Sequence, residues 1–179
     1  MEQNVAKRVP YGIQDFVQVI EQNCYYVDKT AYIPKLEDCP NNLFCIRPRR
    51  FGKSVFLSML HAYYDCRTKD KFQEWFGDLW IGKHPTPLQG RYQVMHLDFS
   101  QVGGSIENLE EKFNFYLGVQ LNGFIRDYLD FYSEKVQKQV EDAKDAGVKL
   151  AIIQSEARSK GYPLYLIIDE YDNFTNTVL

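Results

Sequence analysis

The chain has 179 residues and a formal net charge of −3 at pH 7, and 45% of its residues are hydrophobic and 25% charged. This composition is that of an ordinary globular protein of about one domain. The negative charge argues against a protein that coats nucleic acid, and the sequence has no apolar stretch long enough to span a bilayer.

The start of the chain, the cysteines and the histidines bear on location and metal binding. The first residues do not form a signal-peptide pattern, and the four cysteines lie too far apart for a close-spaced zinc motif. We therefore expect a cytoplasmic protein with reduced thiols, in which Cys45 is a buried strand residue. The histidines have no metal-ligand spacing and are interpreted as structural: His61, His84 and His96.

The elements expected near the N-terminus are short. Residues 1–10 predict a flexible lead-in, and Asp15 is placed to cap a short helix that runs through Ile20. A short strand is expected over residues 24–27, and a helical stretch over residues 31–36.

A basic segment in the middle of the first half resembles a phosphate-binding loop. A strand-like run over residues 43–46 leads into Arg47-Pro48-Arg49-Arg50-Phe51-Gly52-Lys53-Ser54, and a helical pattern follows. A P-loop has Gly, four residues and then Gly-Lys-Ser/Thr between a strand and a helix. Gly52, Lys53 and Ser54 match this pattern, whereas Arg47 stands where the first glycine would be.

The residue types at this loop explain the chemistry that the pattern predicts. Gly52 lets the backbone approach phosphate oxygens at the N-terminus of a helix. Lys53 would reach the β- and γ-phosphates of ATP, and the Ser54 hydroxyl would ligate Mg²⁺. The candidate nucleotide-binding residues are Arg49, Arg50, Phe51, Gly52, Lys53, Ser54 and Val55. The alternative is a basic surface turn that caps a helix.

The middle of the chain predicts a second strand and a long helix. Residues 65–92 are expected to be irregular with one short helix, and residues 93–100 form a core strand. A break at Gly103-Gly104 and an N-cap at Ser105 precede a helix over residues 106–128. Its aromatic residues are interpreted as core and not as a platform for stacking bases.

The last part of the chain carries the second motif. A charged helix over residues 134–160 is expected to end at Gly161. Residues 164–168 form a continuous apolar run, typical of a strand buried on both faces of a parallel sheet, and it ends in Asp169-Glu170. In a P-loop ATPase this is the Walker B position, where Asp169 would hold Mg²⁺ and Glu170 would act as general base. The alternative is a strand that ends in solvated acids.

The alternation of strands and helices predicts an α/β fold with a mostly parallel sheet, and the two motifs predict the three-layer sandwich of a P-loop NTPase. Five segments together resemble the AAA-ATPase-like family. They are Tyr26-Val27-Asp28-Lys29-Thr30, the Arg47–Ser54 string, Leu57-Ser58-Met59-Leu60, Leu97-Asp98-Phe99-Ser100 and Ile168-Asp169-Glu170-Tyr171-Asp172.

This resemblance implies several properties beyond the residues themselves. It implies ATP binding at Gly52, Lys53 and Ser54, with Asp169 and Glu170 as acidic partners. Arg in place of the first P-loop glycine is a feature of the family, and the segment 26–30 is expected to pack near the nucleotide. Proteins of this family are common in gut bacteria and often carry a C-terminal nuclease-like domain of the PD-(D/E)XK type.

The resemblance also implies that the sequence is part of a longer protein. Residues 11–179 would be the N-terminal part of an ATPase domain, truncated after the Walker B strand. In such ATPases a later strand lies between the P-loop strand and the Walker B strand, and an arginine finger comes later still. We therefore expect Mg-dependent ATP hydrolysis in the full-length protein and very slow hydrolysis by this chain alone.

Two other functions are compatible with the same residues. One is a nucleotide-dependent switch or scaffold with little turnover, in which the ATP state orders a partner domain. The other is a nucleic-acid-associated module that would use Arg47, Arg49 and Arg50 on phosphate backbones. In either case an oligomer is possible, because many ATPases of this kind work as rings or dimers.

Overall fold

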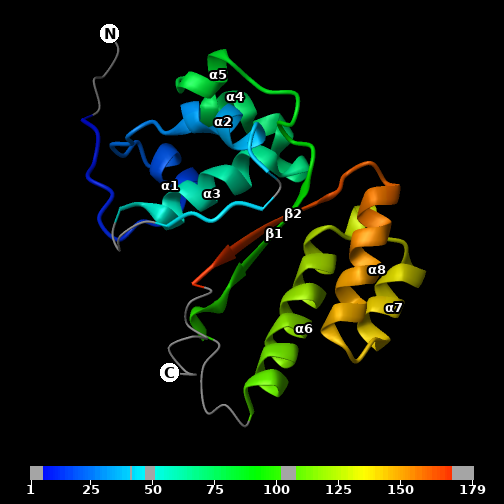
Figure 1. Ribbon diagram of the computed structural model, residues 1–179. Coiled ribbons are helices and arrows are strands. Elements are labelled where there is room, and N and C mark those ends of the chain that lie inside the picture. The colour runs from blue at the N-terminus through cyan, green and yellow to red at the C-terminus, as the bar shows by residue number, and fades with distance from the viewer. Residues whose placement is uncertain (1–5, 41, 47–50, 102–107, 171–179) are drawn as a thin grey trace. The chain divides into compact units, whose positions relative to one another are not determined.

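The computed structural model describes residues 6–40, 42–46, 51–101 and 108–170, shown in Figure 1. The chain divides into two compact units, Met1–Gly90 and Arg91–Leu179. Of the helices that the structure describes, none combines the length and the apolar character that a bilayer-spanning segment needs.

The first unit is built mainly from short helices around α3. Asp15 caps the first helix as predicted, because its side chain accepts a hydrogen bond of 2.8 Å from the Gln18 amide. The expected helical stretch over residues 31–36 is also confirmed. The elements are α1 (Phe16–Glu21), η1 (Thr30–Tyr32), α2 (Ile33–Glu37), α3 (Lys53–Tyr64), η2 (Cys66–Lys71), α4 (Phe72–Phe76) and α5 (Trp80–Lys83).

Aromatic side chains form much of the core of this unit. The rings of Phe16 and Phe76 stack with their centroids 4.9 Å apart, and the Tyr63 ring meets Phe76 edge-on at 5.6 Å. All three side chains are fully buried. The single short helix expected over residues 65–92 was wrong, because α4 and α5 both form there to bury Phe76 and Ile81.

Two strands predicted in this unit are absent from its described residues. Residues 42–46 have no regular structure, and Cys45 is exposed and not buried. Of the strand expected over residues 24–27, only Cys24 pairs, in an isolated bridge with Arg8. Local strand propensity was misleading here because a strand needs a hydrogen-bonding neighbour along its whole length.

The second unit combines a parallel pair of strands with three longer helices. Strands β1 and β2 pair from Gln93 opposite Leu164 to Asp98 opposite Asp169, as expected for parallel neighbours. Helix α8 packs against α6, α7 and β2 (Figure 1). The elements are β1 (Gln93–Asp98), η3 (Phe99–Gln101), α6 (Leu109–Asp127), η5 (Leu129–Phe131), α7 (Glu134–Asp142), α8 (Ala146–Ser159) and β2 (Leu164–Asp169). The chain is thus a mixed helix–strand protein with a parallel strand pair.

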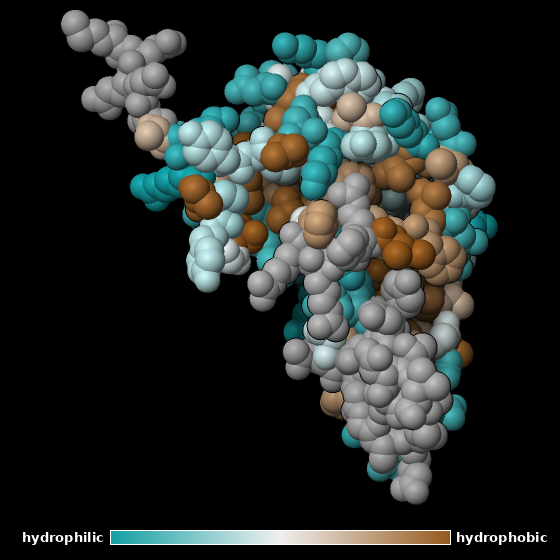
Figure 2. Space-filling model, turned by 60° about the vertical axis from the view of Figure 1, so that its left-hand side comes forward, coloured by the Kyte–Doolittle hydropathy of each residue, from teal (hydrophilic) through white to brown (hydrophobic). Residues whose placement is uncertain are grey.

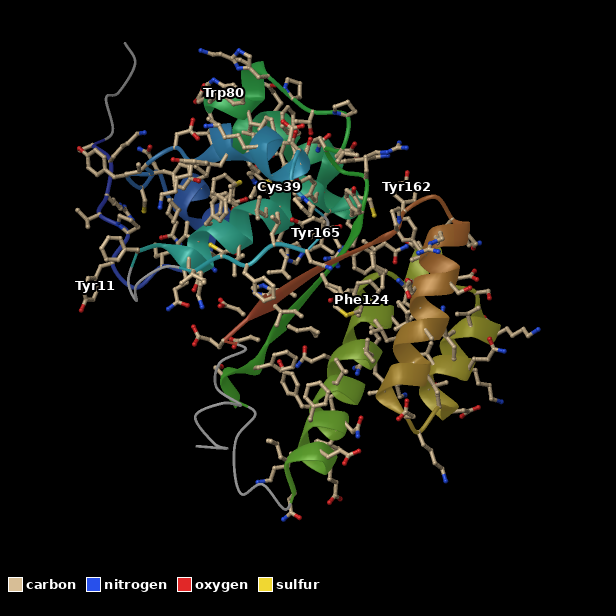
Figure 3. All side chains as sticks on the ribbon, in the orientation of Figure 1. Tyr11, Cys39, Trp80, Phe124, Tyr162 and Tyr165 are labelled. Carbon is tan, nitrogen blue, oxygen red and sulfur yellow. The ribbon has the colours of Figure 1, made fainter. Side chains whose placement is uncertain are left out.

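The long helix of this unit was predicted correctly in its main part. Leu121 and Phe124 of α6 are buried, which confirms that its apolar face belongs to the core (Figure 3). The expected break at Gly103-Gly104 and the N-cap at Ser105 lie outside the described residues.

The charged helix expected over residues 134–160 is in fact two helices. Asp145 caps α8 by accepting a hydrogen bond of 2.9 Å from the Val148 amide. The buried Lys149 ammonium then donates to the carbonyls of Val140 and Glu141 at the end of α7, and to Asn122 Oδ1 at 3.0 Å. This lysine satisfies carbonyls that a continuous helix would have paired internally. Gly161, with φ of 76°, follows α8 as predicted.

The apolar run of β2 is covered on one face only. Ile167 is 4% exposed, whereas Leu166 and Ile168 are each 46% exposed. The prediction of burial on both faces was therefore wrong for the described structure. The expected strand between the P-loop strand and the Walker B strand stays a prediction, since residues 43–46 form no strand with which to compare it.

The edge of β1 that faces away from β2 is closed by tyrosine hydroxyls. The Val94 amide donates to the Tyr128 hydroxyl at 2.8 Å, and the same hydroxyl donates to the Val94 carbonyl at 3.3 Å. The Tyr116 hydroxyl donates to the carbonyl of Asp98 further along the strand. Because α6 occupies these backbone groups, a further strand could pair only on the β2 side.

Removing the Tyr128 hydroxyl should therefore destabilise the second unit. In Tyr128→Phe the buried Val94 amide and carbonyl lose their partner, and we expect unfolding free energy to fall by about 1–3 kcal/mol. Urea denaturation measures this change. Tyr162→Phe is the matched control, because the Tyr162 hydroxyl makes no hydrogen bond within the described residues and its ring stays against Phe131. Equal stability of the two variants would contradict the role given to Tyr128.

Candidate functional site

Helix α3 begins immediately after a left-handed glycine. Gly52 is the N-cap and adopts the left-handed conformation, with φ of 74° and ψ of 30°. The first helical hydrogen bond runs from the Phe56 amide to the Gly52 carbonyl at 3.0 Å. Gly52 has no side chain that could cap this helix, and within the helix itself the amides of Lys53, Ser54 and Val55 lie at the positive end without acceptors.

A hydrogen-bonded pair of side chains fixes α3 against α1. The Ser58 hydroxyl donates to Asp15 Oδ2 at 2.7 Å and accepts from the Phe16 amide at 3.0 Å. Asp15 therefore caps α1 with one carboxylate oxygen and holds α3 with the other. The sequence predicted the cap but not the link to Ser58, because contacts between residues 43 positions apart leave no local signal.

The segment from Tyr26 to Thr30 is fastened to α5 by the Asp28 carboxylate. Asp28 Oδ1 accepts from the Thr30 amide at 2.8 Å and from the Thr30 hydroxyl at 2.7 Å. Asp28 Oδ2 accepts from the amide of Trp80, whose side chain is labelled in Figure 3, at 2.7 Å. The buried Thr30 hydroxyl in turn accepts from the Ile81 amide at 3.1 Å. These four hydrogen bonds fix the backbone on both sides of Lys29.

Tyr26 anchors the beginning of the same segment. Its ring meets the buried Phe16 ring edge-on, with centroids 5.2 Å apart. Burial of the hydroxyl, together with the nearby Asp28 carboxylate, raises the pKa of Tyr26 well above its usual value. Tyr26 is therefore a neutral structural residue at physiological pH.

Lys29 lies next to the loop glycine. A Cβ atom built on Gly52 would come within 3.2 Å of the Lys29 ammonium nitrogen. The segment from Tyr26 to Thr30 therefore does reach the start of α3. A side chain at position 52 would be strained by the positive φ and would also crowd this ammonium group.

The acidic pair lies at the end of β2, in the second unit. Asp169 is the last residue of the strand and is 6% exposed, and its Oδ1 accepts a hydrogen bond of 2.9 Å from the Glu170 amide. Glu170 adopts a positive φ of 52°, which is unusual for a residue other than glycine. Such strained positions cluster at functional sites, where the surrounding structure holds them.

The structure places the other candidate residues as follows. Phe51 is 63% exposed and Val55 is half-buried, whereas Arg49 and Arg50 lie outside the described residues, as does Arg47. Lys53 and Ser54 belong to the first unit and Asp169 and Glu170 to the second, so each pair is described within its own unit. Apolar side chains also reach the surface, as the brown areas of Figure 2 show. Phe44 and Ile46 are among the exposed apolar residues.

The cysteines and histidines have the following contacts in the described part of the chain. All four cysteines are free thiols, and no group of three or more possible metal ligands gathers in the part of the chain that the structure covers. His61 lies 3.3 Å from the carboxylate of Asp65, and the His84 ring stacks on Trp80. Burial alone would raise the pKa of Asp65, but hydrogen bonds from His61 and Arg67 bring it below its ordinary value.

Comparison with known proteins decides which family these features belong to. A family model described as "Predicted AAA-ATPase" matches residues 10–179. The chain belongs to this family. This match confirms the resemblance to the AAA-ATPase-like family that the five sequence segments indicated. Membership of the family makes nucleotide binding the first function to test.

One curated protein that is similar to this chain is much longer than it. It is described as an uncharacterized protein in the vnfD 5′ region of Azotobacter chroococcum mcd 1, and it is 27% identical over 172 residues. The match covers 93% of this chain but only 29% of the relative. No solved structure gave a significant match.

Proposed function

We propose that this chain is the nucleotide-binding part of an ATPase, in which the start of α3 binds the phosphates of Mg-ATP and the acids after β2 support hydrolysis. One observation carries the proposal. In a chain of the Predicted AAA-ATPase family, a left-handed glycine immediately precedes a 12-residue helix that begins Lys53-Ser54. In this geometry the amides of the first helical turn and a lysine lie where a helix N-terminus can bind an anion.

The residues present suit a nucleotide phosphate chain. Gly52 has no side chain between the loop and the α3 amides, and a Cβ atom there would narrow the space toward Lys29. The amides of the first turn would donate to phosphate oxygens, and Lys53 would neutralise charge on the terminal phosphates. Ser58 and Asp15 would keep this end of α3 in place while the ligand binds.

The acidic residues at the end of β2 would supply the carboxylates for metal binding and hydrolysis. Ser54 and Asp169 are the residues that would hold Mg²⁺, which when bound neutralises phosphate charge during transfer. Glu170 would orient and deprotonate the attacking water. Its strained backbone and its hydrogen bond to Asp169 would hold the carboxylate in a defined place.

Thermal unfolding with and without Mg-ATP tests the proposal. At a ligand concentration about 100 times the dissociation constant, binding adds about 2.7 kcal/mol of stability. For a chain of this length we expect the midpoint of unfolding to rise by about 5–10 °C. Lys53→Ala should abolish this rise, whereas Lys83→Ala, which removes an exposed lysine of α5, should keep it. An equal rise in wild type and Lys53→Ala would contradict phosphate binding at α3.

A further inference from the structure

The ammonium group of Lys29 is held beside the positive end of α3. It lies 3.2 Å from the position that a Gly52 Cβ would take, and the Lys29 side chain is half-buried. Within the described residues this ammonium donates no hydrogen bond and forms no ion pair. The backbone carbonyl of Lys29, in contrast, is used by the Tyr32 amide at 3.1 Å.

The residues on either side of Lys29 fix its backbone so that only its side chain remains available. Tyr26, Asp28 and Thr30 alternate along the segment, and each is bound to the body of the first unit, by Phe16, Trp80 and Ile81 respectively. Lys29 has no such contact of its own. The backbone of Lys29 is therefore fixed in place, whereas its ammonium group has no partner among the described residues.

Positive groups lie at the start of α3. The N-terminus of a helix carries about half a positive charge, Lys53 is the first helical residue, and the Lys29 ammonium lies beside the N-cap Gly52. A polyphosphate at the start of α3 would place negative oxygens next to the Lys29 ammonium and the helix N-terminus, and both would attract it.

We propose that Lys29 is a second phosphate-binding lysine of the site and contacts the polyphosphate of a nucleoside di- or triphosphate together with Lys53. The inference rests on the proposed function, because it assigns a residue to the same ligand. It changes the description of the site: the phosphate-binding residues come from two segments, the Asp28–Thr30 turn and the start of α3. It also gives Gly52 a second role, since a side chain there would crowd the Lys29 ammonium.

Calorimetric titration of the chain with Mg-ATP tests this proposal. A hydrogen bond to a charged partner predicts that Lys29→Met weakens binding by about 10- to 100-fold. Lys29→Arg keeps the positive charge and should bind within about fivefold of wild type. Lys83→Met is the matched control, because it removes the same charge from an exposed position on α5 and should leave the dissociation constant unchanged. The affinity of Lys29→Met should also depend less steeply on salt concentration.

The outcomes separate this inference from the proposed function. If wild type binds Mg-ATP, Lys53→Ala does not, and Lys29→Met binds as wild type does, the P-loop stands and the role of Lys29 is overturned. A wild-type chain that does not bind would overturn both. Ligand-free Lys29→Met should unfold within about 2 °C of wild type, as typical of surface substitutions that break no contact. A large loss of stability would instead make Lys29 a structural residue and overturn the proposal.

Discussion

Glu170→Gln is expected to leave Mg-ATP binding within about twofold of wild type and to lower the rate of ATP hydrolysis by about 100- to 10 000-fold. The loss is that of general-base catalysis, because the glutamine amide keeps the size of the side chain but does not accept a proton from water. Glutamine can also adopt the positive φ that Glu170 has in the structure, at a cost close to that of glutamate. Phosphate release under single-turnover conditions measures the change.

The control for this variant removes the same charge elsewhere in the second unit. Glu110 lies on the exposed face of the first turn of α6, so Glu110→Gln should keep the wild-type rate of ATP hydrolysis. A rate that is the same in Glu170→Gln and wild type would show that Glu170 is not the general base. Binding without turnover in either protein would favour the nucleotide-dependent switch over the ATPase.

Gly82→Ala is expected to destabilise the first unit by about 3 kcal/mol or more, at the upper end of what overpacking costs. A Cβ atom at position 82 would lie 2.1 Å from the Phe76 carbonyl oxygen and 2.8 Å from that of Gly77. Both neighbours are backbone atoms, so α4 and α5 would have to separate, and this would shift Phe76, the fully buried last residue of α4. Urea denaturation gives the free-energy difference.

Gly118→Ala is the contrasting substitution. Gly118 lies inside α6, and a Cβ atom there would have no neighbour within 4 Å. Alanine at an open helical position should stabilise the chain by about 0.5–1 kcal/mol, because glycine loses more backbone freedom on folding. A wild-type unfolding free energy for Gly82→Ala would contradict the close packing of α4 and α5.

Local signals in the sequence were sufficient for several elements. Asp15 begins a helix and Gly161 follows one, because a capping side chain and a left-handed residue are recognisable from a few neighbouring positions. The strand over residues 164–169 and most of the helix over residues 109–127 were likewise visible as an apolar run and a helical pattern.

Features that depend on distant contacts were not predictable in this way. The run over residues 43–46 has strand-forming residues, but a strand requires a partner, and these residues have no regular structure. The break between α7 and α8 depends on where the Lys149 ammonium lies. The apolar pattern of β2 indicated a strand correctly but overstated its burial.

The candidate site was predicted in its residues but not in its surroundings. Gly52, Lys53 and Ser54 were recognisable from the motif, and the left-handed glycine and the start of α3 agree with it. The proximity of Lys29 to Gly52 had no sequence signal, because it arises from hydrogen bonds between Asp28, Thr30 and the amides of α5. The family resemblance indicated that the segment 26–30 lies near the nucleotide. The fold shows that Lys29 is the residue of this segment whose side chain lies next to Gly52.

Amide hydrogen exchange with and without Mg-ATP tests most directly whether the start of α3 is the phosphate-binding site. The amides of Lys53, Ser54 and Val55 have no acceptors within the helix, and their exchange should slow by at least about tenfold when phosphate oxygens accept their hydrogen bonds. The account predicts that protection is centred on the peptide covering residues 51–57. Binding of Mg-ATP with unchanged exchange in this peptide would contradict it.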